Sequence, residues 1–168
     1  MSSTSLPPHP PYSATEFETL TSYLDWYRTV MMRKIEDLDP DALRRSPVGS
    51  GTSLGGLVKH LAYVERHWFG GSYGGLELDY PWSEEDPDAD FRLDPEDTVE
   101  SLIDFYKAEC SRSRQIVASR PDLDHVVSAS RGRMVSLRWI LVHMIEETAR
   151  HAGHADILRE MVDGAVGD

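Results

Sequence analysis

The stretch SLRWILVHMIEETARHAGHADILREMV, residues 136–162, decides the fold expected of this chain. Its apolar side chains recur at spacings of three and four residues, which places them in one stripe along an α-helix of about seven turns. Ser136 is a residue type favoured at a helix N-cap, and Gly164 is a type that commonly ends a helix. The sequence therefore predicts one long amphipathic helix. Its stripe consists of Leu137, Ile140, Leu141, Met144, Ile145, Ala152, Ala155, Leu158 and Met161.

Two polar residues, Glu147 and His151, lie on or beside this apolar stripe. They are four residues apart, so their side chains stand one above the other on the same face of the helix. A carboxylate on a buried face is costly to ionise without a partner. Two interpretations follow: a divalent metal held by both side chains, or a polar pair hydrogen-bonded within a helical core. His143 cannot easily complete a metal site with His151, because eight helical residues span about 12 Å.

Length and composition restrict the classes of protein to consider. A chain of 168 residues is most simply one domain, and its net charge of −12 argues against nucleic-acid or anionic-membrane partners. The single cysteine, Cys110, excludes an internal disulfide and suits a reducing compartment. No apolar run approaches the roughly 18 residues that span a bilayer. We expect a cytoplasmic protein with a flexible, proline-rich lead-in over residues 1–14, not a signal peptide, and one domain over residues 15–164.

Helical periodicity predicts three helices ahead of the last one, each with an apolar stripe and an N-cap residue. They cover residues 15–37, 53–69 and 94–119, with Thr15, Thr52 or Ser53, and Asp94 as the N-caps. Gly70 and Gly71 are expected to end the second helix. Pro95 suits the first turn of the third helix. Cys110 falls on the stripe of that helix and is interpreted as a small core residue.

Three connectors join the predicted helices. Residues 38–48 predict a turn or half-helix, and residues 120–135 predict a connector with a short extended piece. Residues 70–95 have no regular pattern, and a loop of this length is usually functional or disordered. Its acidic run SEEDPDAD, residues 83–90, is typical of a solvated surface, because the carboxylates lack the spacing of a calcium loop.

Four long amphipathic helices with long connectors predict an all-α protein, a four-helix bundle. Metal sites in such bundles are built from side chains that project inward from facing helices. His60 lies beside the stripe of the second helix, where a lone histidine is more often a core residue than a ligand. With Glu147 and His151 it would form a two-histidine, one-carboxylate set that leaves a coordination position open, as in catalytic zinc sites. Spacing allows this set but does not demand it.

Three segments resemble the DinB-like superfamily, particularly its branch related to mycothiol-dependent maleylpyruvate isomerase: LDWYR of the first helix, SLGGLVKHLAYVERHWF and SLRWILVHMIEETARHAGHADILRE. The resemblance extends over about residues 15–164. It implies a bundle of the DinB-like type, often dimeric, with a divalent metal between helices. The superfamily's second-helix histidine falls on His60, and its final-helix pair falls on Glu147 and His151. These three are the implied metal ligands, with zinc the expected metal and nickel an alternative.

The same resemblance implies a function. Members of known role use the metal to activate a low-molecular-weight thiol for transfer or isomerisation. We therefore expect a metal-dependent thiol S-transferase that joins a thiol cosubstrate, for which mycothiol is a candidate, to a small electrophile. Two alternatives stay open. One is a non-catalytic, stress-associated metal-binding dimer, and the other is a metal-dependent hydrolase in which Glu146 or His154 carries a proton.

Such a transferase needs a cavity that opens onto the metal. We expect its walls to come from the second and last helices and its rim from Tyr80, Pro81 and Trp82. Arg131 or Arg133 is expected near the mouth, where a guanidinium could grip an anionic ligand.

A homodimer is expected as well. The resemblance is the main reason, and the composition of the first helix adds a second one. Its residues Tyr23, Trp26, Met31 and Met32 are predicted to widen the apolar surface beyond a single stripe.

Overall fold

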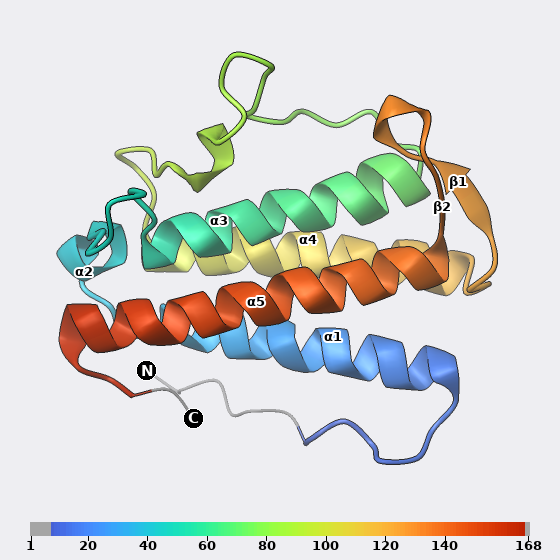
Figure 1. The fold of residues 1–168 in the computed structure, drawn as a ribbon, viewed down its shortest axis with the longest axis horizontal. Coiled ribbons are helices and arrows are strands. Elements are labelled where there is room, and N and C mark those ends of the chain that lie inside the picture. The colour runs from blue at the N-terminus through green and yellow to red at the C-terminus, as the bar shows by residue number, and fades with distance from the viewer. Residues whose placement is uncertain (1–7, 167–168) are drawn as a thin grey trace.

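The structure, a computed structural model, describes residues 8–166 and is mostly helical. Residues 1–7 of the predicted lead-in and the side chain of Arg131 lie outside this description. Four long helices lie side by side (Figure 1): α1 (Glu16–Arg33), α3 (Leu54–Glu65), α4 (Val99–Ser119) and α5 (Leu137–Asp163). Helix α5 packs against both α1 and α3, and α3 packs in turn against α4. The predicted helical class is confirmed at this level.

The last helix begins and ends at the predicted residues. The Ser136 hydroxyl accepts a hydrogen bond from the Trp139 backbone N–H at 3.2 Å, which caps the helix start. Gly164 follows the helix with a φ of 79°, the left-handed conformation that glycine adopts without a steric penalty. Most of the predicted stripe is buried, whereas Met161 is exposed. Helix α5 therefore presents one apolar face to both α1 and α3.

Helix α1 is capped as predicted but ends early. Thr15 and Glu18 form a reciprocal capping box at its start. The helix ends at Arg33, where the backbone N–H groups of Lys34 and Ile35 donate to carbonyls only three residues back, and the chain leaves the helical path at Asp37 with a φ of 63°. A short helix α2 (Pro40–Arg44) follows, as the expected half-helix.

The glycines after α3 do not stop the helix. The chain continues as a π-helix, Arg66–Tyr73, that includes Gly70 and Gly71. A Cβ at Gly70 would lie 2.7 Å from the Leu78 side chain, and one at Gly71 would lie 2.4 Å from the Tyr80 hydroxyl. These glycines allow the following loop to pack closely against the helix. The prediction that Gly70 and Gly71 end the second helix is wrong, because both lie within the π-helix. π-Helical segments are rare in proteins, and the short ones within α-helices frequently lie at functional sites.

The predicted start of the third long helix is also wrong. Helix α4 begins at Val99, where the Thr98 and Ser101 hydroxyls each accept a hydrogen bond from the backbone N–H of the other residue. The carboxylates of Asp94 and Asp97 instead accept hydrogen bonds from the buried Lys59 ammonium, at 2.7 and 2.8 Å. A buried ammonium needs such partners, so this tertiary contact takes Asp94 away from the helix end.

The connectors contain little regular structure. A 3-10 helix, Ala89–Phe91, lies in the loop before α4. After α4, strand β1 (Val126–Ser128) pairs antiparallel with β2 (Met134–Ser136) across a second 3-10 turn, Ser130–Gly132. This hairpin is the expected extended piece. Among the described residues, no helix has both the length and the apolar character that a membrane span requires.

The core consists of two apolar clusters between the long helices. Cys110 is 1% exposed within one of them, as predicted. Met31 and Met32 are buried in the same cluster, which also contains residues of α3, α4 and α5. The prediction that these two methionines widen the exposed apolar surface of α1 is therefore wrong.

Candidate metal centre

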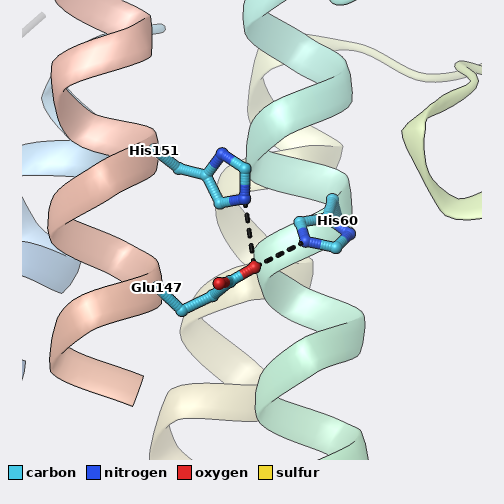
Figure 2. Close-up of side chains that lie close together, drawn as sticks. All are labelled: His60, Glu147 and His151. Atoms are coloured by element: carbon cyan, nitrogen blue, oxygen red, sulfur yellow. Dashed lines mark hydrogen bonds and ion pairs between the residues drawn. The ribbon is translucent and has the colours of Figure 1, made fainter. Parts of the chain in front are cut away.

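Three side chains converge between α3 and α5 (Figure 2). His60 comes from α3, and Glu147 and His151 come from α5, one helical turn apart. Glu147 Oε1 lies 3.3 Å from His60 Nε2 and 3.1 Å from His151 Nε2. One potential ligand atom from each residue lies within 4.8 Å of the others. The helix period places Glu147 and His151 on one face of α5, and packing of α3 against α5 brings His60 opposite them.

The packing of α3 against α5 determines how far the triad side chains are buried. The residues one turn before and after His60, Leu57 and Val64, are buried, and so are Met144 and Ala155 on the facing part of α5. The triad side chains themselves are 11–14% exposed. Their charges are thus largely shielded from solvent, while an edge of the site stays accessible.

The electrostatics of the triad favour ionised Glu147. The hydrogen bond from His151 is the largest effect that lowers the pKa of Glu147, followed by the one from His60, and together they overcome the opposing effect of burial. Burial lowers the pKa of His60, but hydrogen bonds to Asp90 and Glu147 raise it overall above its ordinary value. Arg150 adds an ion pair to the second oxygen of Glu147, at 2.7 Å. The triad therefore favours positive charge beside the ionised Glu147 carboxylate.

The donor set fits a cation. The Asp90 carboxylate lies 2.7 Å from His60 Nδ1 and accepts a hydrogen bond from it, so a neutral His60 carries its lone pair on Nε2. That lone pair then faces Glu147 Oε1 at 3.3 Å. Two lone pairs at this distance repel each other unless a proton or a metal ion lies between them. Imidazole nitrogens and a carboxylate oxygen are ligands that zinc and nickel accept.

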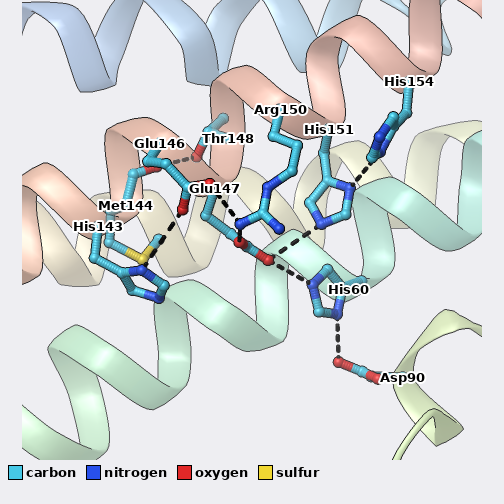
Figure 3. A network of polar contacts seen from close by, with 10 residues as sticks. All are labelled: His60, Asp90, His143, Met144, Glu146, Glu147, Thr148, Arg150, His151 and His154. Atoms are coloured by element: carbon cyan, nitrogen blue, oxygen red, sulfur yellow. Dashed lines mark hydrogen bonds and ion pairs between the residues drawn. The ribbon is translucent and has the colours of Figure 1, made fainter.

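Asp90 lies on the outer side of His60 (Figure 3), and its neighbour Phe91 packs on the same imidazole ring. Asp90 is 3% exposed, although it belongs to the acidic run predicted to be solvated surface. The Phe91 ring stacks on the His60 ring, with centroids 3.9 Å apart and planes at 15°. The prediction that the acidic run is solvated surface is therefore wrong for Asp90. No local pattern in the sequence distinguishes it from its exposed neighbours, because its burial depends on where the loop crosses α3.

The other polar residues of α5 lie around the triad rather than within it (Figure 3). Glu146 is exposed and pairs with Arg150. His154 Nδ1 lies 3.3 Å from His151 Nδ1, on the side away from Glu147. His143 stacks on Trp139 and is not part of the triad, as expected from its spacing. The Glu146 and His154 positions give no support to the proton-carrier role considered for a hydrolase.

A cleft of about 790 Å³ opens beside His60. Its walls come from α3, the π-helix and residues 82–91, whereas α5 does not line it. This differs from the expected walls, because the loop packs over α3 on the side away from α5. Of the predicted rim residues, Trp82 lines the cleft, whereas Tyr80 and Pro81 do not. The Tyr80 ring stacks on the Trp82 ring, with centroids 4.7 Å apart. Arg133 is exposed and lies outside the lining, so no structural support exists for its predicted place at the mouth.

Comparison with known proteins identifies the family. Residues 19–164 match the family model described as Mycothiol-S-transferase, which includes all four long helices except the first turn of α1. No curated protein matches the chain. The matched range contains His60, Glu147 and His151 and extends over most of the 168 residues. The chain therefore belongs to the mycothiol-S-transferase family.

Proposed function

We propose that this protein is a metal-dependent thiol S-transferase. His60, Glu147 and His151 would hold a divalent metal, and a low-molecular-weight thiol such as mycothiol would be the cosubstrate. The observation that carries the proposal is the meeting of two imidazole Nε2 atoms at one carboxylate oxygen, at 3.3 and 3.1 Å. Family membership supports the choice of the thiol.

The protein's own residues have distinct tasks in this proposal. Glu147 provides the negative ligand, and its ion pair with Arg150 keeps that carboxylate in place. His60 and His151 provide neutral nitrogen ligands from two different helices. Because the protein supplies three ligands, a fourth position is left for the substrate, as in catalytic zinc sites. A bound divalent metal lowers the pKa of a coordinated thiol, so that the thiolate is available at neutral pH.

The cleft beside His60 supports a second, electrophilic substrate. Trp68, Trp82 and Phe91 offer aromatic surface there, and His60 belongs both to this cleft and to the triad. The thiolate sulfur would form a bond to the electrophilic carbon while the leaving group departs with its electron pair. A cleft with this lining would shelter an apolar reactant from water next to His60, one of the proposed metal ligands.

Further parts of the proposal concern the setting of the site. We propose that residues 15–164 form one functional domain, a four-helix bundle of the DinB-like type. The contacts of α5 with α1 and α3, and of α3 with α4, support such a bundle. A cytoplasmic location is proposed because a free thiol cosubstrate persists in a reducing compartment. Zinc is the proposed metal and nickel the alternative.

Metal analysis tests the ligand assignment. The purified protein should contain about one equivalent of divalent metal per chain, as expected for a single three-ligand site. His151→Ala should lose most of it, because two protein ligands hold the metal much less tightly. His143→Ala is the matched control on the same helix and should retain the metal. Full occupancy in His151→Ala, or loss in His143→Ala instead, would contradict the assignment.

An activity assay separates the three functions. The metal-loaded protein is incubated with a low-molecular-weight thiol and an aromatic halide, and then with the halide and water alone. A transferase forms the thioether only when the thiol is present. Hydrolysis without thiol would favour the hydrolase, and no product in either case, with metal bound, would favour the non-catalytic alternative.

A further inference from the structure

We propose that Asp90 is a positioning residue that fixes the His60 ring for metal binding, and that residues 89–97 form a strap that holds Asp90 in place. The proposal rests on the metal site proposed above and adds a residue to it. Asp90 does not meet the metal ligands Glu147 or His151; its contact is with the outer nitrogen of His60, at 2.7 Å (Figure 3).

The hydrogen bond from His60 to Asp90 determines which nitrogen can bind a metal. The Asp90 carboxylate accepts a proton-bearing Nδ1, which leaves Nε2 of His60 free on the side of Glu147. An imidazole in the other tautomer would point its lone pair at Asp90 and its N–H at the metal position. A carboxylate behind a ligating histidine also increases the basicity of the ring. Asp90 thus selects the tautomer that the site needs.

The ring plane of His60 is fixed as well as its tautomer. Phe91 stacks on one face of the ring at 3.9 Å between centroids, almost parallel to it. The side chain of His60 is 13% exposed and that of Asp90 is 4% exposed, so water competes little for their hydrogen bond. Two successive residues of one loop therefore restrain the imidazole, one through its edge and one through its face.

The strap is attached to α2 and α3 at several points. The Phe91 carbonyl oxygen lies so close to α3 that a Cβ at Gly56 would be 2.3 Å from it. The Lys59 ammonium, next to His60 in the chain, binds the carboxylates of Asp94 and Asp97. In addition, one guanidinium nitrogen of Arg44 donates to the backbone carbonyls of Asp94, Pro95 and Asp97, at 2.8, 3.1 and 2.6 Å. These contacts make the strap a fixed part of the site rather than a mobile loop.

Zinc affinity of Asp90 variants tests the proposal. The metal-free protein is titrated with zinc in competition with a chromogenic chelator. Asp90→Ala should weaken zinc binding about 10- to 100-fold, the usual effect of losing such an outer partner. Asp90→Asn keeps the size and an acceptor oxygen but not the charge, so its effect should be intermediate. Asp88→Asn is the matched control, because Asp88 belongs to the same acidic run but is exposed. Its zinc affinity should stay within about twofold of wild type.

A second pair of variants tests the strap without changing Asp90. Gly56→Ala must displace the Phe91 backbone and should weaken zinc binding in the same way as Asp90→Asn. Gly153→Ala is the control, because a Cβ there meets no atom within 4 Å although the residue lies near His151. Thermal unfolding of the metal-free proteins shows whether each variant is folded.

The imidazole of His60 gives a readout that a purely structural role for Asp90 would not change. In the zinc-loaded wild type, long-range nitrogen–proton NMR should show a proton on Nδ1 that exchanges slowly with water. In folded Asp90→Ala that proton should exchange rapidly. Unchanged zinc affinity and an unchanged Nδ1 proton in both Asp90 variants would overturn the proposal, as would an equal loss of affinity in Asp88→Asn. If the wild type binds no zinc, the proposed function fails together with this inference; unaffected Asp90 variants defeat the inference alone.

Discussion

At the scale of single residues, the site depends on Glu147 Oε1 and the Nε2 lone pair of a neutral His60, which repel each other unless a proton or a metal ion lies between them. Glu147 Oε1 faces two Nε2 atoms, and Asp90 directs the proton of His60 to the opposite side of the ring. Buried polar groups in this arrangement are costly unless a positive charge joins them. His60, Glu147 and His151 would therefore stabilise a hydrophobic core poorly. This favours a role of the triad in binding over a role in core packing.

Cys110 should be unreactive in the folded protein. It is 1% exposed, and burial raises the pKa of its thiol well above the usual value, so the nucleophilic thiolate is scarce. An aromatic disulfide reagent should find no thiol in the native protein and about one per chain in guanidinium chloride. Rapid titration of the native thiol would contradict this expectation. The result matters for activity assays, because the thiol consumed in them would then come from the cosubstrate.

The sequence predicts site residues unequally. Glu147 and His151 stand out because their spacing places two ligands on an otherwise apolar helix face. His60 looks like an ordinary core histidine until the resemblance to other chains selects it. Asp90 cannot be found in this way, because it belongs to an acidic run and only the path of the chain over Gly56 buries it.

At the scale of elements, a buried ion pair joins α1 to α3. The guanidinium of Arg28 donates two hydrogen bonds to Glu65, at 2.7 and 2.6 Å, and a third to Asp25. Glu65 is 0% exposed and Arg28 is 3% exposed. Forming such a pair adds little net stability, but breaking it leaves an uncompensated buried charge.

Glu65→Gln should therefore destabilise the protein strongly. We expect a loss of about 3–5 kcal/mol in the free energy of unfolding, since a neutral amide cannot offset the Arg28 charge. Urea denaturation of the metal-free protein measures this loss. Glu16→Gln is the control, because its ion pair with Arg138 lies at the surface, and its unfolding midpoint should hardly change. A loss below about 1 kcal/mol in Glu65→Gln would show that Arg28 finds other partners.

Element boundaries follow from the sequence only where the signals are local. Helix α5 was predictable at both ends because its apolar period, its Ser136 cap and Gly164 all belong to the segment itself. The start of α4 was not, because Lys59 recruits Asp94 and Asp97 from a distant part of the chain. The π-helix is not predictable from the sequence, because Gly70 and Gly71 resemble a helix stop signal, whereas they allow Leu78 and Tyr80 to pack closely against the helix.

At the scale of the whole molecule, a homodimer remains a prediction from the family resemblance. Four apolar residues of α1 were expected to widen its exposed surface for dimer contact. Two of them, Met31 and Met32, are buried and cannot contribute to such a contact. Light scattering at micromolar protein concentration should give about twice the chain mass of 19.0 kDa. A particle of single-chain mass would remove this prediction without affecting the metal site, whose three ligands come from one chain.

The central property proposed for the whole molecule is a metal ion that the triad holds and that a thiol can reach. The most direct measurement is the absorption spectrum of the cobalt-substituted protein during titration with low-molecular-weight thiols. Thiol binding at the open position should produce a sulfur-to-metal charge-transfer band. Glu147→Gln should weaken that band, because the site loses its negative ligand and holds the metal less tightly. An unchanged spectrum with several thiols at millimolar concentration, in fully metal-loaded protein, would contradict the claim.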